Sequence, residues 1–172
     1  GMVSALTYSR SLDGGVTWDI NRSVIPQIDA SNYYHFNGDD YDIDVNGDNV
    51  AIVAGGLDND VVLLKSSDNG GTWTKTIVKQ FPIPMFDATT MITDIDSDGI
   101  ADTLETNDGS VQVLLDENGM AHVWYGNMLM INDAPSSTGA VSYFPGTDGL
   151  MYWNESMGSS PAVMIAAAHY LY

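Results

Sequence analysis

The sequence predicts an all-β protein, and three observations support this fold class. Short β-branched or apolar runs recur at 41–45, 50–54, 61–64 and 111–115. Turn phrases such as Asn46-Gly47-Asp48 and Glu117-Asn118-Gly119 stand beside them. No segment keeps a 3.6-residue apolar period for three turns, and the best helix candidate, 162–170, reads equally well as a buried strand.

One eight-residue phrase occurs twice, as SLDGGVTW at 11–18 and SSDNGGTW at 66–73. Both copies read S-x-D-x-G-x-T-W, which between two strands predicts a turn bonded to itself. The Asp and the hydroxyls take up free backbone N–H groups, Gly supplies a positive φ, and Trp covers the turn. The defined positions are Ser11, Asp13, Gly15, Thr17 and Trp18, and then Ser66, Asp68, Gly70, Thr72 and Trp73.

The residues around the second copy predict four antiparallel strands, at about 40–46, 49–55, 60–66 and 73–79. Aligning the two copies pairs 6–9 with 61–64 and Arg10 with Lys65. A four-stranded unit that recurs at this spacing is typical of a β-propeller blade. A third unit has strands at 110–116, 121–125 and 149–155; the alternative for its end is a degenerate copy of the phrase that runs from Gly146 to Trp153.

We therefore expect one β-propeller portion over 2–172, with units at about 2–30, 31–81 and 82–172. Propellers close with about four to eight blades, so roughly three units form an incomplete ring with exposed strand edges. Either the chain is a fragment of a longer protein, which we favour, or copies self-associate through the open blade edges.

The repeated phrase resembles the Asp-box, or BNR repeat, of sialidases and related secreted propellers. The resemblance implies a structural turn that lies far from any active centre. Sialidases hold the substrate carboxylate with three arginines, but this chain has only Arg10 and Arg22, and 21–26 is a scrambled echo of their Arg-Ile-Pro phrase. Lysine does not replace the guanidinium clamp. No complete sialidase site is encoded, and we assign no catalytic residue.

The stretch DIDSDGIADTLE at 94–105 matches the calcium-loop template D-x-[DN]-x-[DN]-G-x5-E. Five carboxylates in twelve residues repel one another in a compact empty loop, and a hard divalent cation removes that repulsion. Nearby prolines argue against two flanking helices, so we expect a structural calcium loop within an insertion; the alternative is a solvated acidic loop. The predicted ligands are Asp94, Asp96, Asp98, the Ile100 carbonyl, Asp102 and Glu105.

Charge is the strongest feature of the composition. Five Lys and Arg against 23 Asp and Glu give a net charge of −18, and no Lys or Arg follows Lys79. Such a surface repels phosphate, so we expect no nucleic-acid partner and no anionic membrane. No apolar run reaches the ~20 residues of a membrane span, and no signal peptide is seen. We expect a secreted or cell-surface protein, because calcium or salt outside the cell screens the charge.

Several single residues are weaker candidates. Glu155 beside Tyr152 and Trp153 suits sugar stacking, although these aromatics read more simply as core. His35, His122 and His169 are too far apart in sequence to indicate a metal cluster, and His122 reads as structural. Acidic residues at 42, 44 and 48 faintly repeat the calcium pattern, but a strand with one polar face explains them.

These observations leave three functional hypotheses. The first is a non-catalytic, sialidase-like propeller portion that binds a glycan or protein ligand or serves as a scaffold, with a structural calcium loop. The second is a fragment of a BNR-repeat glycoside hydrolase of exo-sialidase type, whose catalytic residues lie mostly outside this chain. The third is a calcium-dependent adhesion module.

Overall fold

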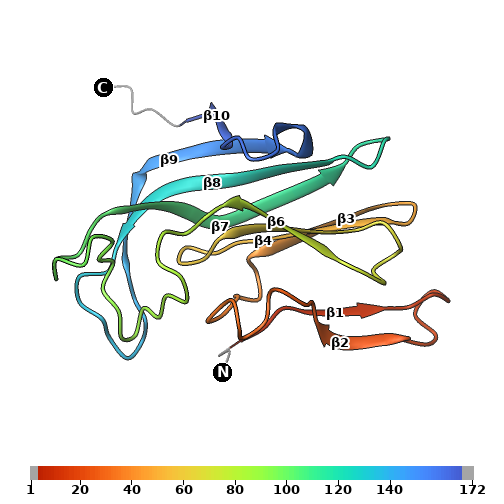
Figure 1. Ribbon diagram of the computed structural model, residues 1–172, viewed down its shortest axis with the longest axis horizontal. Coiled ribbons are helices and arrows are strands. Elements are labelled where there is room, and N and C mark those ends of the chain that lie inside the picture. Colours follow the sequence, from red (N-terminus) through yellow and green to blue (C-terminus); the bar gives the residue numbers. More distant parts are fainter. Residues whose placement is uncertain (1–3, 168–172) are drawn as a thin grey trace.

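The computed structural model describes residues 4–167, and these form an all-β protein of three antiparallel sheets (Figure 1). The strands are β1 (Thr7–Arg10), β2 (Ile20–Val24), β3 (Tyr41–Asn46), β4 (Asn49–Ala54), β5 (Val61–Ser66), β6 (Thr74–Lys79), β7 (Leu104–Leu115), β8 (Ala121–Ile131), β9 (Ser142–Asn154) and β10 (Val163–Ala166). A single turn of 3₁₀ helix, η1 (Glu155–Met157), follows β9. The predicted fold class is therefore confirmed at the all-β level, with no closed ring of sheets among these residues.

The second sheet has the strand order β3-β4-β5-β6, so each strand pairs with its neighbour in the sequence. All four predicted strands occur within one residue of their expected bounds. Asn46 pairs with Asn49 across the β3–β4 turn, where Gly47 adopts a φ of 61°. Local turn chemistry and alternation were enough to predict this sheet.

The first sheet contains only β1 and β2, with the first copy of the repeated phrase between them. The third sheet has the order β10-β9-β8-β7, and its strands are longer than the sequence predicted. Segment 162–170 contributes β10 as far as Ala166, which decides against the helix within the described residues. All four residues of β10 are exposed, so the expected burial of this strand is wrong. Trp153 lies inside β9, so the stretch that starts at Gly146 is strand, and a degenerate copy of the phrase there is wrong.

The stretch Asn107-Asp108-Gly109 lies within β7, which begins at Leu104, before the strand expected at 110–116. The register of β7 against β8 shifts between Asn107 and Val111, and Gly109 has a φ of 82°. This is a β-bulge, which bends the strand and leaves backbone groups that side chains must satisfy. The bulge places Asp108 and Gly109 at the end of the second sheet, beside Asp40.

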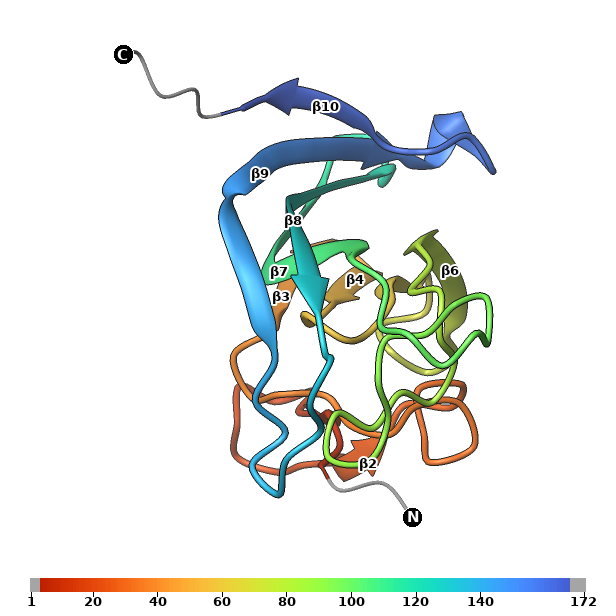
Figure 2. The same ribbon diagram turned by 90° about the vertical axis from the view of Figure 1, so that its left-hand side faces the viewer.

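The three sheets stack in layers, and the middle one is covered on both faces (Figures 1 and 2). Residues of β4 alternate between its two faces. Ala51 and Val53 pack toward the third sheet, whereas Ile52 and Ala54 pack toward the β2–β3 connection and Tyr8 of the first sheet. This explains why β4 and β5 read as continuous apolar runs rather than as alternating strands. Burial of each Val, Leu or Ile side chain contributes about 1.5–3 kcal/mol to the free energy of folding.

Carboxylates on β3 accept hydrogen bonds from the edge of β7 that pairs with no strand among the described residues. The Oδ2 atom of Asp42 accepts a hydrogen bond from the Val113 N–H at 3.0 Å, and Oδ2 of Asp44 accepts one from Leu115 at 2.7 Å. The Asn46 side chain donates to the Asp116 carbonyl at 2.7 Å. These acidic residues, which faintly resembled a calcium site, therefore satisfy the edge of a strand in the next sheet.

A third core cluster holds the long connections together. It contains Phe81, Phe86 and Ala88 from the β6–β7 connection, with Leu104 and Met130 from the third sheet. No helix in the described residues is long and apolar enough to span a membrane.

Candidate functional site

The antiparallel order sorts the connections to two ends of the molecule. The three longest connections, 25–40, 80–103 and 132–141, gather with 55–60 at one end, on the left in Figure 1. The short β3–β4 and β7–β8 turns, η1 and both copies of the repeated phrase lie at the other end. Long loops over a rigid scaffold are the usual location of binding residues, so the long-loop end is the first place to examine.

The first copy of the repeated phrase is bonded as its sequence predicts. Ser11 Oγ accepts from the Gly15 N–H at 2.7 Å and donates to Asp13 Oδ1 at 2.9 Å. The Thr17 N–H donates to Asp13 Oδ1 at 2.8 Å, and its hydroxyl donates to Oδ2 at 2.7 Å. These hydrogen bonds, of which those from Thr17 have the largest effect, lower the pKa of Asp13 to about 2. Trp18 is 55% exposed rather than folded over the turn.

The second copy repeats this hydrogen bonding. Ser66 Oγ accepts from the Gly70 N–H at 2.8 Å, and Asp68 Oδ1 accepts from the Thr72 N–H at 2.8 Å. Hydrogen bonds from Thr72 and Ser66 lower the pKa of Asp68 to about 2. Trp73 packs edge-on against Tyr8 of the first sheet, with ring centroids 5.2 Å apart. Both copies are thus turns at the end remote from the long loops.

The basic residue before each copy reaches the next sheet. Arg10 Nη1 donates to the Asn69 carbonyl, inside the second copy, at 2.7 Å. Lys65 forms an ion pair with Glu155, which stands in the corresponding turn after β9. The sequence aligned Arg10 with Lys65, and the structure uses both positions as ties between sheets.

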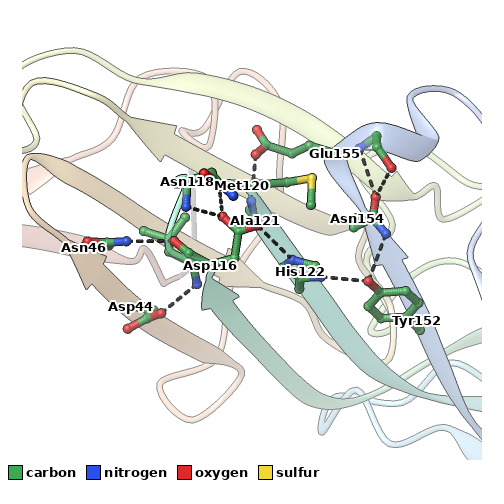
Figure 3. Close-up of polar contacts among 12 residues, drawn as sticks. Asp44, Asn46, Asp116, Asn118, Met120, Ala121, His122, Tyr152, Asn154 and Glu155 are labelled. Carbon is green, nitrogen blue, oxygen red and sulfur yellow. Dashed lines mark hydrogen bonds and ion pairs between the residues drawn. The ribbon is translucent and has the colours of Figure 1, made fainter.

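Glu155, the carboxylate that suited sugar stacking, is occupied by structural contacts (Figure 3). Besides Lys65, its Oε2 atom accepts from the Ala121 N–H at 2.7 Å. Trp153 beside it is only 2% exposed. Tyr152 points to the other face of the third sheet, where its hydroxyl contacts His122 Nδ1 at 2.7 Å and accepts from Asn154 Nδ2 at 2.9 Å.

The acidic loop brings three of its predicted ligands together. Ligand oxygens of Asp94, Asp96 and Asp102 lie within 4.8 Å of one another. Asp94 and Asp102 also accept from loop N–H groups, those of Gly99 at 2.9 Å and Ile95 at 2.8 Å. Carboxylate oxygens that converge in this way are the donor set that hard cations such as calcium take.

The other predicted ligands lie differently. Asp98 Oδ1 accepts from the Ile100 N–H at 2.8 Å, and the Ile100 side chain is 69% exposed. Glu105 belongs to β7 and forms an ion pair with Lys79 at 2.7 Å. The cluster thus contains three of the six predicted ligands, and the full calcium set stays a prediction.

Buried polar residues hold the base of this loop. Thr93 donates its hydroxyl to the Asp102 carbonyl at 2.6 Å, and it accepts from the Asn132 N–H at 3.1 Å. The Asn132 side chain donates to the Ala88 and Met91 carbonyls at 3.0 and 2.8 Å. The two ends of the loop are therefore tied to each other and to the end of β8.

A cleft of about 690 Å³ opens beside the β7 bulge. Acidic, amide and aromatic side chains line it: the carboxylates of Asp39, Asp40 and Asp108, the amide of Gln112 and the ring of Trp124. No Lys or Arg lines it. The local sequence offered no motif for these residues, because the second and third sheets contribute them from strands far apart in the chain.

Glycines make room for two of the cleft carboxylates. A Cβ at Gly109 would lie 2.8 Å from Asp40 Oδ1, and one at Gly126 would lie 2.1 Å from Asp108 Oδ2. Asn107, which is fully buried, donates to the Gly56 carbonyl at 2.7 Å and accepts from its N–H at 2.8 Å. Its side-chain oxygen also accepts from the Gly109 N–H at 3.0 Å, so this amide joins the β4–β5 connection to the bulge.

A smaller cleft of about 390 Å³ surrounds His35 and Asp58. Nε2 of His35 lies 3.2 Å from Asp58 Oδ1, and this contact raises the pKa of His35 despite its burial. Tyr34 and Asp87 line the same cleft, where burial, with a smaller contribution from Asp87, raises the pKa of Tyr34. His35 therefore has a carboxylate partner that its position in the sequence did not indicate.

Comparison of the chain with protein-family models, with curated proteins and with solved structures found no significant match.

Proposed function

We propose that this chain is a non-catalytic binding portion of a β-propeller-like protein. In this proposal the 690 Å³ cleft binds neutral carbohydrate, and a calcium ion stabilises the acidic loop. The resemblance of the repeated phrase to the Asp-box, and the strand order of the two larger sheets, support the propeller part. The acidic surface and the calcium loop are consistent with a secreted or surface location.

The observation that carries the proposal is the lining of the 690 Å³ cleft. Carboxylates at Asp39, Asp40 and Asp108 are acceptors for sugar hydroxyls, and Gln112 can both donate and accept. Trp124 offers an aromatic face against which a sugar ring stacks through its C–H groups. Anionic ligands are disfavoured, since three carboxylates and no cationic side chain line the cleft.

A sialidase role fits poorly with the positions of the two arginines. Arg10 is bonded to Asp19 and Asn69 at the tight-turn end, and Arg22 lies on β2. Neither lines the cleft. The alternative is a glycoside hydrolase portion that acts on a neutral sugar, and the presence of several carboxylates in one cleft favours it, because such enzymes use a carboxylate pair.

Carbohydrate binding can be tested by calorimetric titration of the chain with a panel of neutral oligosaccharides. We expect binding that Trp124→Ala weakens by about tenfold or more, since stacking and burial of one ring contribute on the order of 1–2 kcal/mol. Trp18→Ala, which removes an exposed tryptophan at the opposite end, is the matched control and should bind normally. Equal affinity of the two variants would contradict the proposal, as would an absence of binding across the panel.

Calcium can be tested on the same protein by titration and thermal melting. Calcium should raise the melting temperature, because a ligand that binds only the folded state stabilises it, and a chelator should reverse the effect. Asp96→Asn should abolish both responses, whereas Glu117→Gln, which removes a charge from the β7–β8 turn, should leave them intact.

A variant at Glu105 distinguishes the observed cluster from the full calcium-loop template. If Glu105→Gln leaves calcium affinity unchanged, Asp94, Asp96 and Asp102 hold the ion without it. If it abolishes binding, the carboxylate leaves Lys79 and completes the template on binding. A melting temperature that does not respond to calcium would identify an acidic loop without an ion.

A further inference from the structure

The outer strand of the second sheet exposes an apolar row. Tyr41, Ile43 and Val45 of β3 are 46%, 48% and 55% exposed. They share a face with Ile52 and Ala54 of β4, because Ile43 pairs with Ile52 and Tyr41 with Ala54. Over β4 and β5 that face is covered by the β2–β3 connection, through Ile25, Ile28, Tyr33 and Phe36, and by Tyr8 of the first sheet, so Ile52 and Ala54 are buried.

In the third sheet, the positions of β7 that correspond to this row of β3 are covered. Val111, Val113 and Leu115 occupy β7, the outer strand of that sheet, and are only 8%, 6% and 7% exposed. They are buried because β3 and β4 lie beneath them, with apolar contacts from Ala51 and Val53. In the described residues the first sheet has no strands in the place that β3 and β4 occupy in the second.

The first sheet also presents a strand edge toward this space. β5 and β9 each pair with a strand on both sides, whereas β1, which aligns with β5, pairs within the described residues only with β2. An apolar cavity of about 250 Å³ lies between the layers here. Leu6 and Tyr8, before and on β1, line it together with Ile25 and Ile28 of the β2–β3 connection. Tyr41, Ile43 and Ile52 line it from the second sheet.

We propose that the free edge of β1 and the row Tyr41, Ile43 and Val45 form one docking surface for a β-hairpin of a partner polypeptide. The inner strand of the hairpin pairs with β1, and its apolar side chains cover the β3 row and fill the cavity. The proposal is independent of the carbohydrate cleft.

The β3–β4 hairpin itself indicates the chemistry of this partner, because it packs against the third sheet as the partner hairpin would pack against the second. It places small apolar residues, Ala51 and Val53, against the next sheet. It also places carboxylates, Asp42 and Asp44, on the edge N–H groups of β7. We therefore expect a partner hairpin with small aliphatic residues at alternate positions of its inner strand and Asp or Asn at alternate positions of its outer strand. Backbone pairing supplies affinity and the alternate side chains supply specificity, as in other cases of strand addition.

The test attaches such a hairpin to the full chain. Residues 40–56 are placed ahead of Met2, so that six residues separate the added second strand from Leu6, as residues 55–60 separate β4 from Val61. The control carries Ala51→Asn and Val53→Asn in the added copy only. Both proteins are compared by urea unfolding and by amide hydrogen exchange.

The proposal predicts a higher urea midpoint for the extended chain than for its control, and exchange slowed by at least about tenfold at the amides of β1 and of Ile43. Equal midpoints and equal exchange would overturn it. Sedimentation of the unextended chain tests the other occupant: a dimer that Ile43→Lys abolishes would show that a second copy covers this surface instead of a hairpin.

Discussion

The two copies of the repeated phrase have the same local structure and different surroundings. In both, the Ser oxygen accepts from a Gly N–H and the Asp accepts from the Thr N–H and hydroxyl, at distances that agree within 0.2 Å. The pKa of the Asp is lowered to about 2 in each. Eight residues are therefore sufficient to specify this turn wherever it occurs in the chain.

The difference lies in what packs against each turn. The first copy is open to solvent, with Trp18 55% exposed and Val16 81% exposed. The second copy receives Tyr8 and Arg10 from the first sheet, and its Trp73 packs against the buried cluster between the first and second sheets. The same phrase thus makes a surface turn in one place and a contact between layers in the other.

Removal of each tryptophan should expose this difference most strongly. We expect Trp73→Ala to lower the free energy of unfolding by about 2–3 kcal/mol, because a half-buried ring and its contact with Tyr8 are lost. Trp18→Ala should cost less than about 1 kcal/mol, since its ring is already largely in water. Urea unfolding of both variants measures the gap; equal losses would mean that Trp73 adds nothing to the contact between layers.

Alanine at the matched glycines should give the next largest gap. Gly15 and Gly70 have φ values of 92° and 79°, so alanine strains both turns by about 1 kcal/mol. A Cβ at Gly15 meets nothing within 4 Å, whereas one at Gly70 would lie 1.8 Å from the Tyr8 hydroxyl oxygen. Gly70→Ala should therefore cost about 1 kcal/mol more, because Tyr8 must move. In a Tyr8→Ala background the two glycine variants should become equal.

Low pH should affect the two turns alike, so the difference in stability between matched variants should be smallest here. The pKa of Asp13 and of Asp68 is lowered from 3.8 to about 2 in the folded state. Their contribution to stability is therefore present above pH 3.8 and is lost as the pH falls through about 2. Asp13→Asn and Asp68→Asn should each flatten the dependence of the urea midpoint on pH between about 5 and 2, by similar amounts. A much steeper effect at one site would show that its tertiary surroundings also tune the carboxylate.

Local pattern predicted most of the second sheet because its information is short-range. Alternation and turn phrases such as Asn46-Gly47-Asp48 specify strands and hairpins among residues close in sequence. The same reasoning did not predict that β7 begins at Leu104 and runs through Asn107-Asp108-Gly109 as a bulge. There, pairing with β8 on both sides of the phrase outweighed the local preference for a turn.

The candidate sites were predictable only to the extent that one segment builds them. The acidic loop could be predicted because its carboxylates lie in twelve consecutive residues, whereas the ion pair of Glu105 with Lys79 could not. The 690 Å³ cleft could not be predicted, since Asp40, Asp108 and Trp124 come from segments that only the stacking of two sheets brings together.

The sequence by itself determined the all-β class, the strands of the middle sheet and the two self-bonded turns, because backbone geometry and short-range hydrogen bonds depend on near neighbours. Only the tertiary structure decided that Asp42 and Asp44 bond the edge of β7, that His35 pairs with Asp58, and that Trp73 is covered while Trp18 is not. These outcomes depend on burial and on contacts between layers, which identical local phrases cannot encode.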